Sequence, residues 1–414
     1  MNKPISPLSR RELLGAAAAV GAVGLGSLQL SAQAAPSHPA LADAIARLQY
    51  LTPPDQFCKF VREKPRIDSL SPEKLRSIGL DRDTWQLEVI PDADSDCKIG
   101  QSLGKDRGTA LSFAQLLKLA ENHAVRYVKV MTCTNAPDPF GVGLWEGVPL
   151  REVVWLTRPS ANVRRLYSFG YHNDDPKQRF QSSLPISRVL EDAPGDLPVI
   201  LCYKCNGQWL SAKAGGPVRL IVPESYGNRC IKWLQRIVLT NSYQCNDTYA
   251  TWNNDVESPL KTYARFINPP KQAKTNQAIT LVGAAQVGMS GLSKVQYSVR
   301  RQGEALPPDD PYFTKLNWID AAILPPPENW GGGLPDGKLP PVPLQFDPAT
   351  GKPRSWPMRY ALAHWSALVE DLPVGEYELR CRSIDGNGVA QPMPRPFAKA
   401  GANSIQVVRL TVEA

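Results

Sequence analysis

The stretch YVKVMTCTNAPDPFG, residues 127–141, is the part of the sequence from which both fold and function can be argued. Its first five residues are mostly apolar, which predicts a buried strand, and that strand ends at Cys133. A polar loop rich in glycine and proline follows. A thiol that a strand end presents to a loop can serve as a nucleophile or as a ligand for a soft metal. A nucleophilic Cys133 would need a histidine nearby, and the nearest in the sequence, His123, is expected at a helix end.

Short strands and short helices alternate on both sides of this stretch. The periodicity predicts strands at 85–90, 199–203, 218–222 and 232–239, and helices at 41–50, 111–120 and 150–156. The second of these helices has a favourable N-cap residue, Ser112. Because strands and helices are mixed, we expect an α+β fold for residues 35–270.

The chain changes character after the prolines at 269–270. Strands separated by turns are expected at 278–281, 292–300, 375–384 and 404–412, and no convincing helix accompanies them. A segment rich in proline and glycine, 303–357, interrupts the series as an insertion. Spaced strands of this kind predict an immunoglobulin-like β-sandwich over residues 271–414.

The composition sets further bounds. The chain has 414 residues, enough for two or three domains, and 43% of them are hydrophobic. Its 39 prolines disfavour a helical bundle, and its four histidines leave few candidates for a histidine-based metal site. The net charge of +8 contains no long basic run, so no nucleic-acid partner is expected. The excess of positive charge could steer an anionic substrate or an acidic electron-transfer partner towards the protein, or simply keep the protein soluble.

The N-terminus has the layout of an export signal. Arg10 and Arg11 precede the uncharged run 16–30, and small residues follow at 31–35. This pattern predicts a twin-arginine (Tat) signal peptide, residues 1–34, and a periplasmic or otherwise exported protein. A transmembrane anchor is the alternative, but the run is short and rich in glycine. The Tat route exports folded proteins, often with a cofactor inserted, so a bound cofactor is expected. Cleavage removes three basic residues and one acidic residue, which leaves a net charge of +6.

The cysteines leave several interpretations open. Cys202 and Cys205 form a C-x-x-C pattern in a predicted strand, whereas a redox motif of this type needs to open a helix. Cys230 and Cys245 could complete a zinc site, but their spacing fits no standard zinc module. Buried apolar thiols or one structural disulfide remain the simplest interpretation.

The stretch around Cys133 resembles the molybdopterin-binding domain of the sulfite oxidase family. In that family a strand ends in a cysteine that ligates molybdenum, and a W-x-G-x-x-L segment follows, as at 145–150 here. Three more motifs match in family order. These are L-T-P at 51–53 with F-V-R at 60–62, N-G-Q at 206–208, and G-x-P-V-R-x-x-V-P with the later K-W in residues 215–233. The resemblance covers nearly the whole chain after the signal peptide.

The resemblance implies a molybdopterin cofactor and assigns residues to it. Cys133 is the molybdenum ligand, which suits a metal that takes its other sulfur ligands from the pterin. Arg219 and Lys232 bind the cofactor phosphate. The full set of implied cofactor contacts is Phe60, Val61, Arg62, Glu63, Lys64, His172, Asn173, Arg219, Cys230, Ile231 and Lys232. Glu63 and Lys64 replace an Asn-His pair of the family, and Ala214 replaces a histidine.

The sequence departs from the family at the substrate site. The family usually has Ala-Gly-Asn-Arg after the ligand cysteine, and that arginine helps to bind sulfite, whereas residues 134–137 here contain no arginine. Arg229 or the basic pair at 300–301 could replace it. The family's active-site tyrosine matches Tyr249 or Tyr243, of which Tyr249 is preferred.

The resemblance therefore implies an exported oxidoreductase that transfers an oxygen atom at molybdenum and oxidises sulfite or a related sulfur compound. A periplasmic sulfoxide reductase is the alternative, although that family usually lacks a C-terminal sandwich. A non-catalytic binding scaffold is a further alternative. No C-x-x-C-H haem motif is present, so electrons are expected to pass to a separate carrier such as a cytochrome c. The sandwich corresponds to the family's dimerisation domain and implies a homodimer.

Overall fold

The structure is a computed structural model. It describes residues 38–57, 67–134, 136, 138–171, 180–252, 255, 257, 259–310, 313–392, 401 and 403–414. Some predictions lie outside these residues, namely the signal peptide 1–34 and the cofactor contacts Phe60, Val61, Arg62, Glu63, Lys64, His172 and Asn173. Among the described helices, none has the length and hydrophobicity that crossing a bilayer requires.

The first half of the chain consists of two small sheets with short helices around them. The elements are α2 (Pro39–Ala46), η1 (Ile67–Ser69), α3 (Pro72–Ser77), β1 (Gln86–Pro91), β2 (Leu111–Ser112), α4 (Phe113–His123), β3 (Val125–Met131), β4 (Gly141–Pro149), α5 (Leu150–Leu156), β5 (Arg165–Gly170), β6 (Gln181–Pro185), α6 (Ile186–Leu190), β7 (Ile200–Cys205), β8 (Gln208–Trp209), η2 (Ala212–Ala214), β9 (Arg219–Ile221), β10 (Leu234–Thr240) and α7 (Thr248–Thr251).

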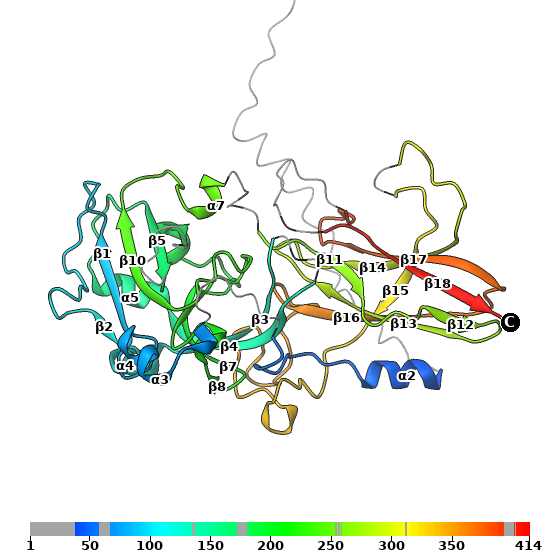
Figure 1. Ribbon diagram of the computed structural model, residues 1–414, viewed down its shortest axis with the longest axis horizontal. Helices are drawn as coiled ribbons and strands as arrows, with labels where there is room; N and C mark the ends of the chain where they lie inside the picture. Colours follow the sequence, from blue (N-terminus) through cyan, green and yellow to red (C-terminus); the bar gives the residue numbers. More distant parts are fainter. Residues whose placement is uncertain are drawn as a thin grey trace, which may run out of the picture.

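The two sheets divide these strands. One sheet has the order β2-β1-β10-β5-β6, in which β1 and β10 are parallel and the other pairs antiparallel. The second has the order β3-β4-β7-β8, with β9 paired to β7 (Figure 1). The helix predicted at 111–120 is α4, and Ser112 caps it in a capping box with Gln115. The predicted α+β fold is confirmed.

The second half is built from strands. They are β11 (Tyr263–Phe266), β12 (Gln272–Lys274), β13 (Ile279–Gln286), β14 (Lys294–Arg301), β15 (Ile319–Ile323), β16 (Leu362–Val369), β17 (Gly375–Ile384) and β18 (Gln406–Glu413), with the short helix η3 (Pro335–Gly337). β15 pairs with β14 on one side and with β16 on the other, so the sheet curls around a core of its own. The predicted β-sandwich is confirmed. Helix α2 contacts its strands β13 and β16 (Figure 1).

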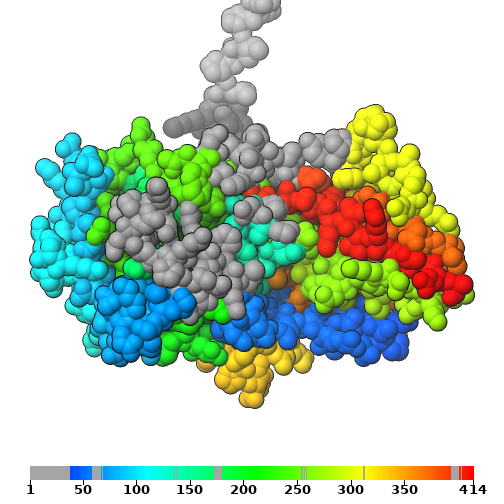
Figure 2. Space-filling model, in the orientation of Figure 1, coloured from blue at the N-terminus to red at the C-terminus, as the bar shows by residue number. Residues whose placement is uncertain are grey.

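The insertion at 303–357 contributes to the core of the first half. Trp330 and Phe346 are buried there, and the Trp330 carbonyl accepts a hydrogen bond from Leu51 at 2.8 Å. Asn206 donates to the carbonyl of Gly332 at 2.9 Å. In Figure 2 the gold segment around residue 340 lies at the lower edge of the molecule, below the green and blue segments. The part of the insertion around Trp330 and Phe346 therefore packs into the first half, whereas the earlier part, drawn yellow in Figure 1, projects from the sandwich.

Candidate active site

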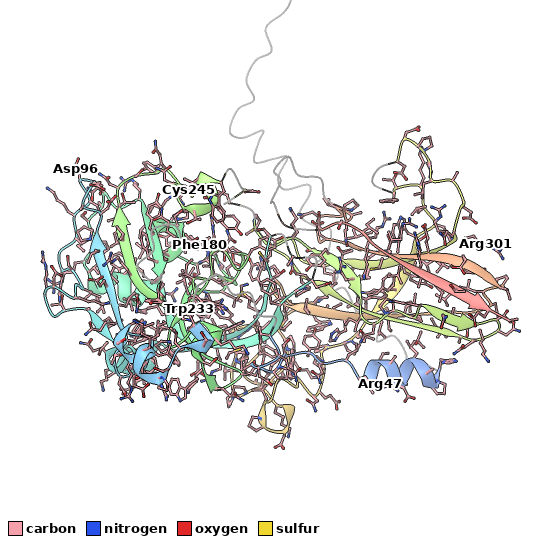
Figure 3. The ribbon with its side chains drawn as sticks, viewed as in Figure 1. Arg47, Asp96, Phe180, Trp233, Cys245 and Arg301 are labelled. Atoms are coloured by element: carbon pink, nitrogen blue, oxygen red, sulfur yellow. The ribbon has the colours of Figure 1, made fainter. Side chains whose placement is uncertain are left out.

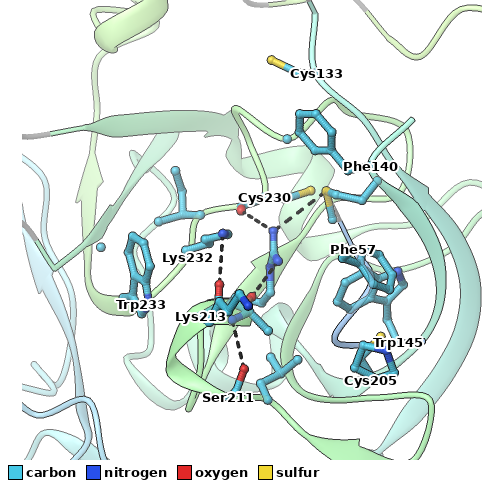
Figure 4. Close-up of a pocket in the computed structure, with 18 of the residues that line it drawn as sticks. Phe57, Cys133, Phe140, Trp145, Cys205, Ser211, Lys213, Cys230, Lys232 and Trp233 are labelled. Atoms are coloured by element: carbon cyan, nitrogen blue, oxygen red, sulfur yellow. Dashed lines mark hydrogen bonds between the residues drawn. The ribbon is translucent and has the colours of Figure 1, made fainter. Parts of the chain in front are cut away.

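A pocket of about 410 Å³ brings together the predicted site residues that the structure describes. Its wall includes Cys133, Arg219, Cys230, Ile231, Lys232 and Tyr249. In Figure 4, Cys133 and Phe140 lie at one end of the pocket and Lys213 and Ser211 at the other, with Cys230 and Lys232 between them. Residues from strand ends, turns and a short helix thus converge on one elongated space.

Cys133 is held in place through the backbone on both sides of its strand. Strand β3 pairs with β4, and the Val130 N–H donates to the carbonyl of Tyr360 at 2.7 Å on the opposite edge. The Thr132 carbonyl accepts from the Gly227 N–H at 2.7 Å. A Cβ at Gly227 would lie 3.1 Å from that oxygen, which explains why the turn can approach so closely with glycine there. The thiol therefore stands at a fixed strand end in the pocket wall.

Arg219 is a buried cation in the pocket wall. Its guanidinium donates to the carbonyls of Ala214 at 2.8 Å and Cys230 at 3.1 Å, and it lies 5.3 Å from the ring centroid of Trp145. Its buried Nε has no hydrogen-bond partner among the described residues. Burial lowers the pKa of Arg219 below its ordinary value, because desolvation disfavours the charge. An anion in the pocket would relieve this penalty.

Two lysines add positive charge to the pocket, Lys213 at the end away from Cys133 and Lys232 between the two ends. The Lys232 Nζ donates to the carbonyl of Lys213 at 3.3 Å and lies 5.4 Å from the ring centroid of Trp233. Gly215 has a left-handed φ of +98°, and a Cβ there would lie 2.6 Å from Lys232 Cγ. The prediction from sequence included Lys232 but missed Lys213. Lys213 belongs to none of the motifs that the sequence matches, so no local pattern marks it as a site residue.

Lys129 is another buried cation close to the pocket residues Arg219 and Cys230. The side chain is completely buried on β3, and its Nζ donates to the carbonyls of Val130 at 2.8 Å and Ser225 at 3.1 Å. Burial lowers the pKa of Lys129. The oxygen atoms that accept hydrogen bonds from Lys129 and Arg219 are backbone carbonyls, which carry no full charge. The site therefore holds several buried cations whose desolvation cost an anionic ligand would offset.

The two candidate tyrosines lie in different surroundings. Tyr249 lines the pocket, and its helix α7 is capped by Asp247, whose carboxylate accepts from the Tyr249 and Ala250 N–H groups at 3.1 Å. The Tyr249 ring lies 5.9 Å from that of Phe180, another wall residue. Tyr243 is 76% exposed and stacks against Arg164. The geometry favours Tyr249 as the tyrosine that can reach a substrate.

The cysteines of the C-x-x-C pattern are buried free thiols. Desolvation raises the pKa of Cys202 to about 12 and that of Cys205 well above its ordinary value, so both thiols stay protonated at neutral pH. Cys230 and Cys245, the other candidate zinc ligands, are free thiols as well. In the same part of the chain no three His, Cys, Asp or Glu side chains could jointly hold a metal ion. A zinc site at these cysteines is therefore not present among the described residues.

Of the candidate replacements for the missing arginine, one lies close to the pocket. Arg300 and Arg301 belong to β14 of the sandwich, and Figure 3 shows Arg301 at the opposite end of the molecule from Phe180 and Trp233. Arg229 follows directly after the wall residues Gly227 and Asn228. Within one chain the pair at 300–301 therefore lies away from the pocket, whereas Arg229 stays a candidate.

The residues present fit a molybdopterin. The pocket is long, has a thiol at one end and three cations, Arg219, Lys232 and Lys213, towards the other. A thiolate suits molybdenum, and cations suit a phosphate. The orphaned Nε of Arg219 marks a buried donor that a bound anion can satisfy. Trp145 and Phe57 supply apolar walls between these ends.

The comparisons with known proteins agree with this geometry. Residues 78–248 match the family model described as oxidoreductase molybdopterin binding domain. The NAD(P)H nitrate reductase of Betula pendula is 31% identical over 114 residues, 25% of this chain and 12% of that protein. NADH nitrate reductase 1 of Arabidopsis thaliana is 29% identical over 161 residues, 35% of this chain and 17% of that protein. The chain thus spans less than a fifth of the length of these relatives.

A solved structure extends the similarity to the whole fold. The sulfane dehydrogenase SoxCD from Paracoccus pantotrophus superposes with a TM-score of 0.56 and 16% sequence identity, covering 92% of this chain and 95% of that one. This likeness includes the sandwich and supports the fold alone. Residues 78–248 form an oxidoreductase molybdopterin binding domain, whose cofactor is molybdenum–molybdopterin.

Proposed function

We propose that this protein is an exported molybdenum enzyme that oxidises sulfite or a related small sulfur compound and passes the electrons to a separate carrier. The observation that carries the proposal is the position of Cys133, at a strand end in the wall of a cation-rich pocket. Bound molybdopterin supplies the molybdenum centre at which an oxygen atom and an electron pair are exchanged with the substrate. The chain supplies the binding site and its electrostatics.

Each wall residue has a role in this proposal. Cys133 provides the protein's thiolate ligand, and Arg219 and Lys232 hold the cofactor phosphate. Cys230 and Ile231, which line the pocket between these ends, would contact the cofactor when it is bound. Tyr249 donates a hydrogen bond to the substrate from α7. The apolar ring of Phe140 excludes water from the thiolate side of the pocket, and that of Trp145 does so farther from the thiol.

The choice of a sulfur compound rests on two supports. The resemblance of the motifs is to the sulfite oxidase family, and the structurally similar SoxCD is a sulfane dehydrogenase. The C-terminal sandwich adds weight, because the sulfoxide reductase family usually lacks one. Oxidation is therefore favoured over sulfoxide reduction.

A steady-state assay tests the direction and the substrate. We expect sulfite or thiosulfate to reduce ferricyanide or a c-type cytochrome in the presence of the holoenzyme, and Cys133→Ser to abolish the reaction. Cys205→Ser is the matched control, since Cys205 also lines the pocket but stays a protonated thiol. Reduction of methionine sulfoxide by the holoenzyme, without any sulfite oxidation, would overturn the proposal in favour of a reductase.

Export and dimer formation belong to the same proposal. The paired Arg10 and Arg11 support Tat export, and replacing both with lysine should leave the protein in the cytoplasm. The sandwich supports a homodimer by analogy with the family. Light scattering at micromolar concentration should give twice the mass of the mature chain, which is smaller than the 45.5 kDa of the full sequence, and the mass of one mature chain would contradict the dimer.

A further inference from the structure

The segment 132–140, which contains Cys133, connects β3 to β4 as a hairpin loop. The two strands pair up to Met131 and Gly141, and the Phe140 N–H donates to the Met131 carbonyl at 2.7 Å. Cys133 and Phe140 both line the pocket and lie at the same end of it (Figure 4). The conformation of this loop therefore decides where the thiol and the Phe140 ring stand in the pocket wall.

The sandwich reaches this loop through an ion pair. The Nε of Arg265 lies 2.6 Å from Asp138 Oδ1. Arg265 belongs to β11, and every residue of that strand is paired with β13, so the backbone that carries the guanidinium is fixed. The Arg265 side chain is 19% exposed, whereas that of Asp138 is 67% exposed. The loop thus brings its carboxylate to a cation that the sandwich holds in place.

The same strand contacts the start of the loop. The Tyr263 side chain is buried, and burial raises the pKa of its hydroxyl; the Thr132 side chain offsets part of this rise, so the two side chains lie close together. Thr132 directly precedes Cys133, and its carbonyl accepts from the Gly227 N–H at 2.7 Å. Strand β11 therefore approaches the loop twice, beside the thiol and again at Asp138.

The ion pair is too exposed to add much to the overall stability. Water screens a pair with one largely exposed partner, and ordering the two side chains costs entropy. A charge-assisted hydrogen bond is nevertheless short and directional, so it can favour one position of a loop whose two ends are already fixed. Position matters at such a site, because a displacement of about 1 Å can lower a catalytic rate about a hundredfold.

We propose that strand β11 positions the loop after Cys133 through the ion pair of Arg265 with Asp138, which makes the sandwich a working part of the active site. Both residues are positioning residues, because they act on the pocket through Cys133 and Phe140. The inference rests on the proposed function only where turnover is measured, since the position of the loop can be observed without a substrate.

Amide hydrogen exchange of the holoenzyme tests the position of the loop directly. Asp138→Asn and Arg265→Met should each speed exchange severalfold in the segment 132–140 and leave the melting temperature nearly unchanged. The double variant should match either single variant, because the two side chains act as one unit. The matched control is Asp320→Asn, which breaks the exposed pair of Asp320 with Lys294 in the sandwich and should not alter this segment. Unchanged exchange in both single variants would overturn the inference.

Turnover and electron paramagnetic resonance of the partly reduced molybdenum show whether the loop position matters to the site. In Asp138→Asn and Arg265→Met, kcat/KM for sulfite should fall about ten- to a hundredfold, the resonance should change shape, and the molybdenum content should stay at the wild-type level. Arg265→Lys keeps the charge and should recover most of the activity. Faster exchange with wild-type turnover and resonance would overturn the role of the sandwich in the active site.

The two proposals fail in different ways. A wild-type holoenzyme that oxidises no sulfite contradicts the proposed reaction, whereas the exchange rates and the resonance after reduction with dithionite still decide the inference. Sulfite oxidation that is equally fast in the wild type and in both single variants contradicts the inference and leaves the proposed reaction standing.

Discussion

Gln345 binds both backbone polar groups of Val128: its Oε1 accepts from the Val128 N–H at 2.8 Å, and its Nε2 donates to the Val128 carbonyl at 3.0 Å. The two residues lie 217 positions apart in the sequence. One side chain thus takes the place of a neighbouring strand on the outer edge of β3, the strand that ends next to Cys133. The insertion therefore supports the functional thiol from a distance.

Replacing Gln345 tests this support. Gln345→Ala leaves the N–H and carbonyl of Val128 without their partner, so we expect the free energy of unfolding to fall by about 1–3 kcal/mol. The molybdenum content of the purified protein should fall as well, because the strand end becomes less fixed. Gln101→Ala, at an exposed position, is the control. Equal denaturation midpoints for the two variants would refute this role of Gln345.

Replacing Arg219 should affect the cofactor-free protein and the holoprotein differently: stability changes little in the first, and cofactor is lost from the second. In the cofactor-free protein, Arg219→Met removes a buried, uncompensated charge, so we expect little loss of stability or a small gain. In the holoprotein the same variant should lose most of its molybdopterin, because the phosphate loses a charged partner. Metal analysis and thermal melting of both forms check this. A variant that keeps full cofactor would show that Arg219 does not bind the phosphate.

Tyr249 and Tyr243 should differ in their effect on turnover. Tyr249→Phe removes a hydroxyl from the pocket wall, and we expect kcat/KM for sulfite to fall about a hundredfold if this hydroxyl acts in the transition state. Tyr243→Phe should remain within about twofold of the wild type, because its side chain is 76% exposed. The reverse order would assign the family's tyrosine to Tyr243.

His364 should make the protein sensitive to acid. Burial lowers its pKa from 6.5 to about 4, so the unfolded chain binds a proton before the folded protein does. Above pH 6.5 both states are neutral at this residue; as the pH falls from 6.5 to 4, stability is lost, about 3 kcal/mol in total.

A pair of histidine variants isolates this effect. His364→Leu should flatten the fall in unfolding free energy between pH 6.5 and 4, and His123→Leu, at the partly exposed end of α4, should not. If the two variants follow the same pH curve as the wild type, protonation of His364 does not control acid stability.

Much of the first half could be predicted from the sequence, because its motifs are local. The strand before Cys133 and the helix at 150–156 depend on short runs of apolar residues, and both appear as β3 and α5. The positions of Arg219, Cys230 and Lys232 followed from one contiguous motif, and the structure brings them into one pocket.

The rest depends on contacts between distant segments. The insertion looked like a loop because it is rich in proline and glycine, yet Trp330 and Phe346 pack into the first half and Gln345 pairs with β3. The ion pair between Arg265 and Asp138 is equally invisible in the sequence, since its two residues belong to different halves of the chain. No local periodicity encodes such pairings.

The central claim is that the Cys133 thiolate binds molybdenum. X-ray absorption at the molybdenum edge of the wild type, Cys133→Ser and Cys205→Ser measures the sulfur ligands directly. We expect about one molybdenum per chain in the wild type, the same sulfur count in Cys205→Ser, and one sulfur fewer in Cys133→Ser. An identical sulfur count in all of them, or a folded wild-type protein without molybdenum from a host that makes the cofactor, would contradict the claim.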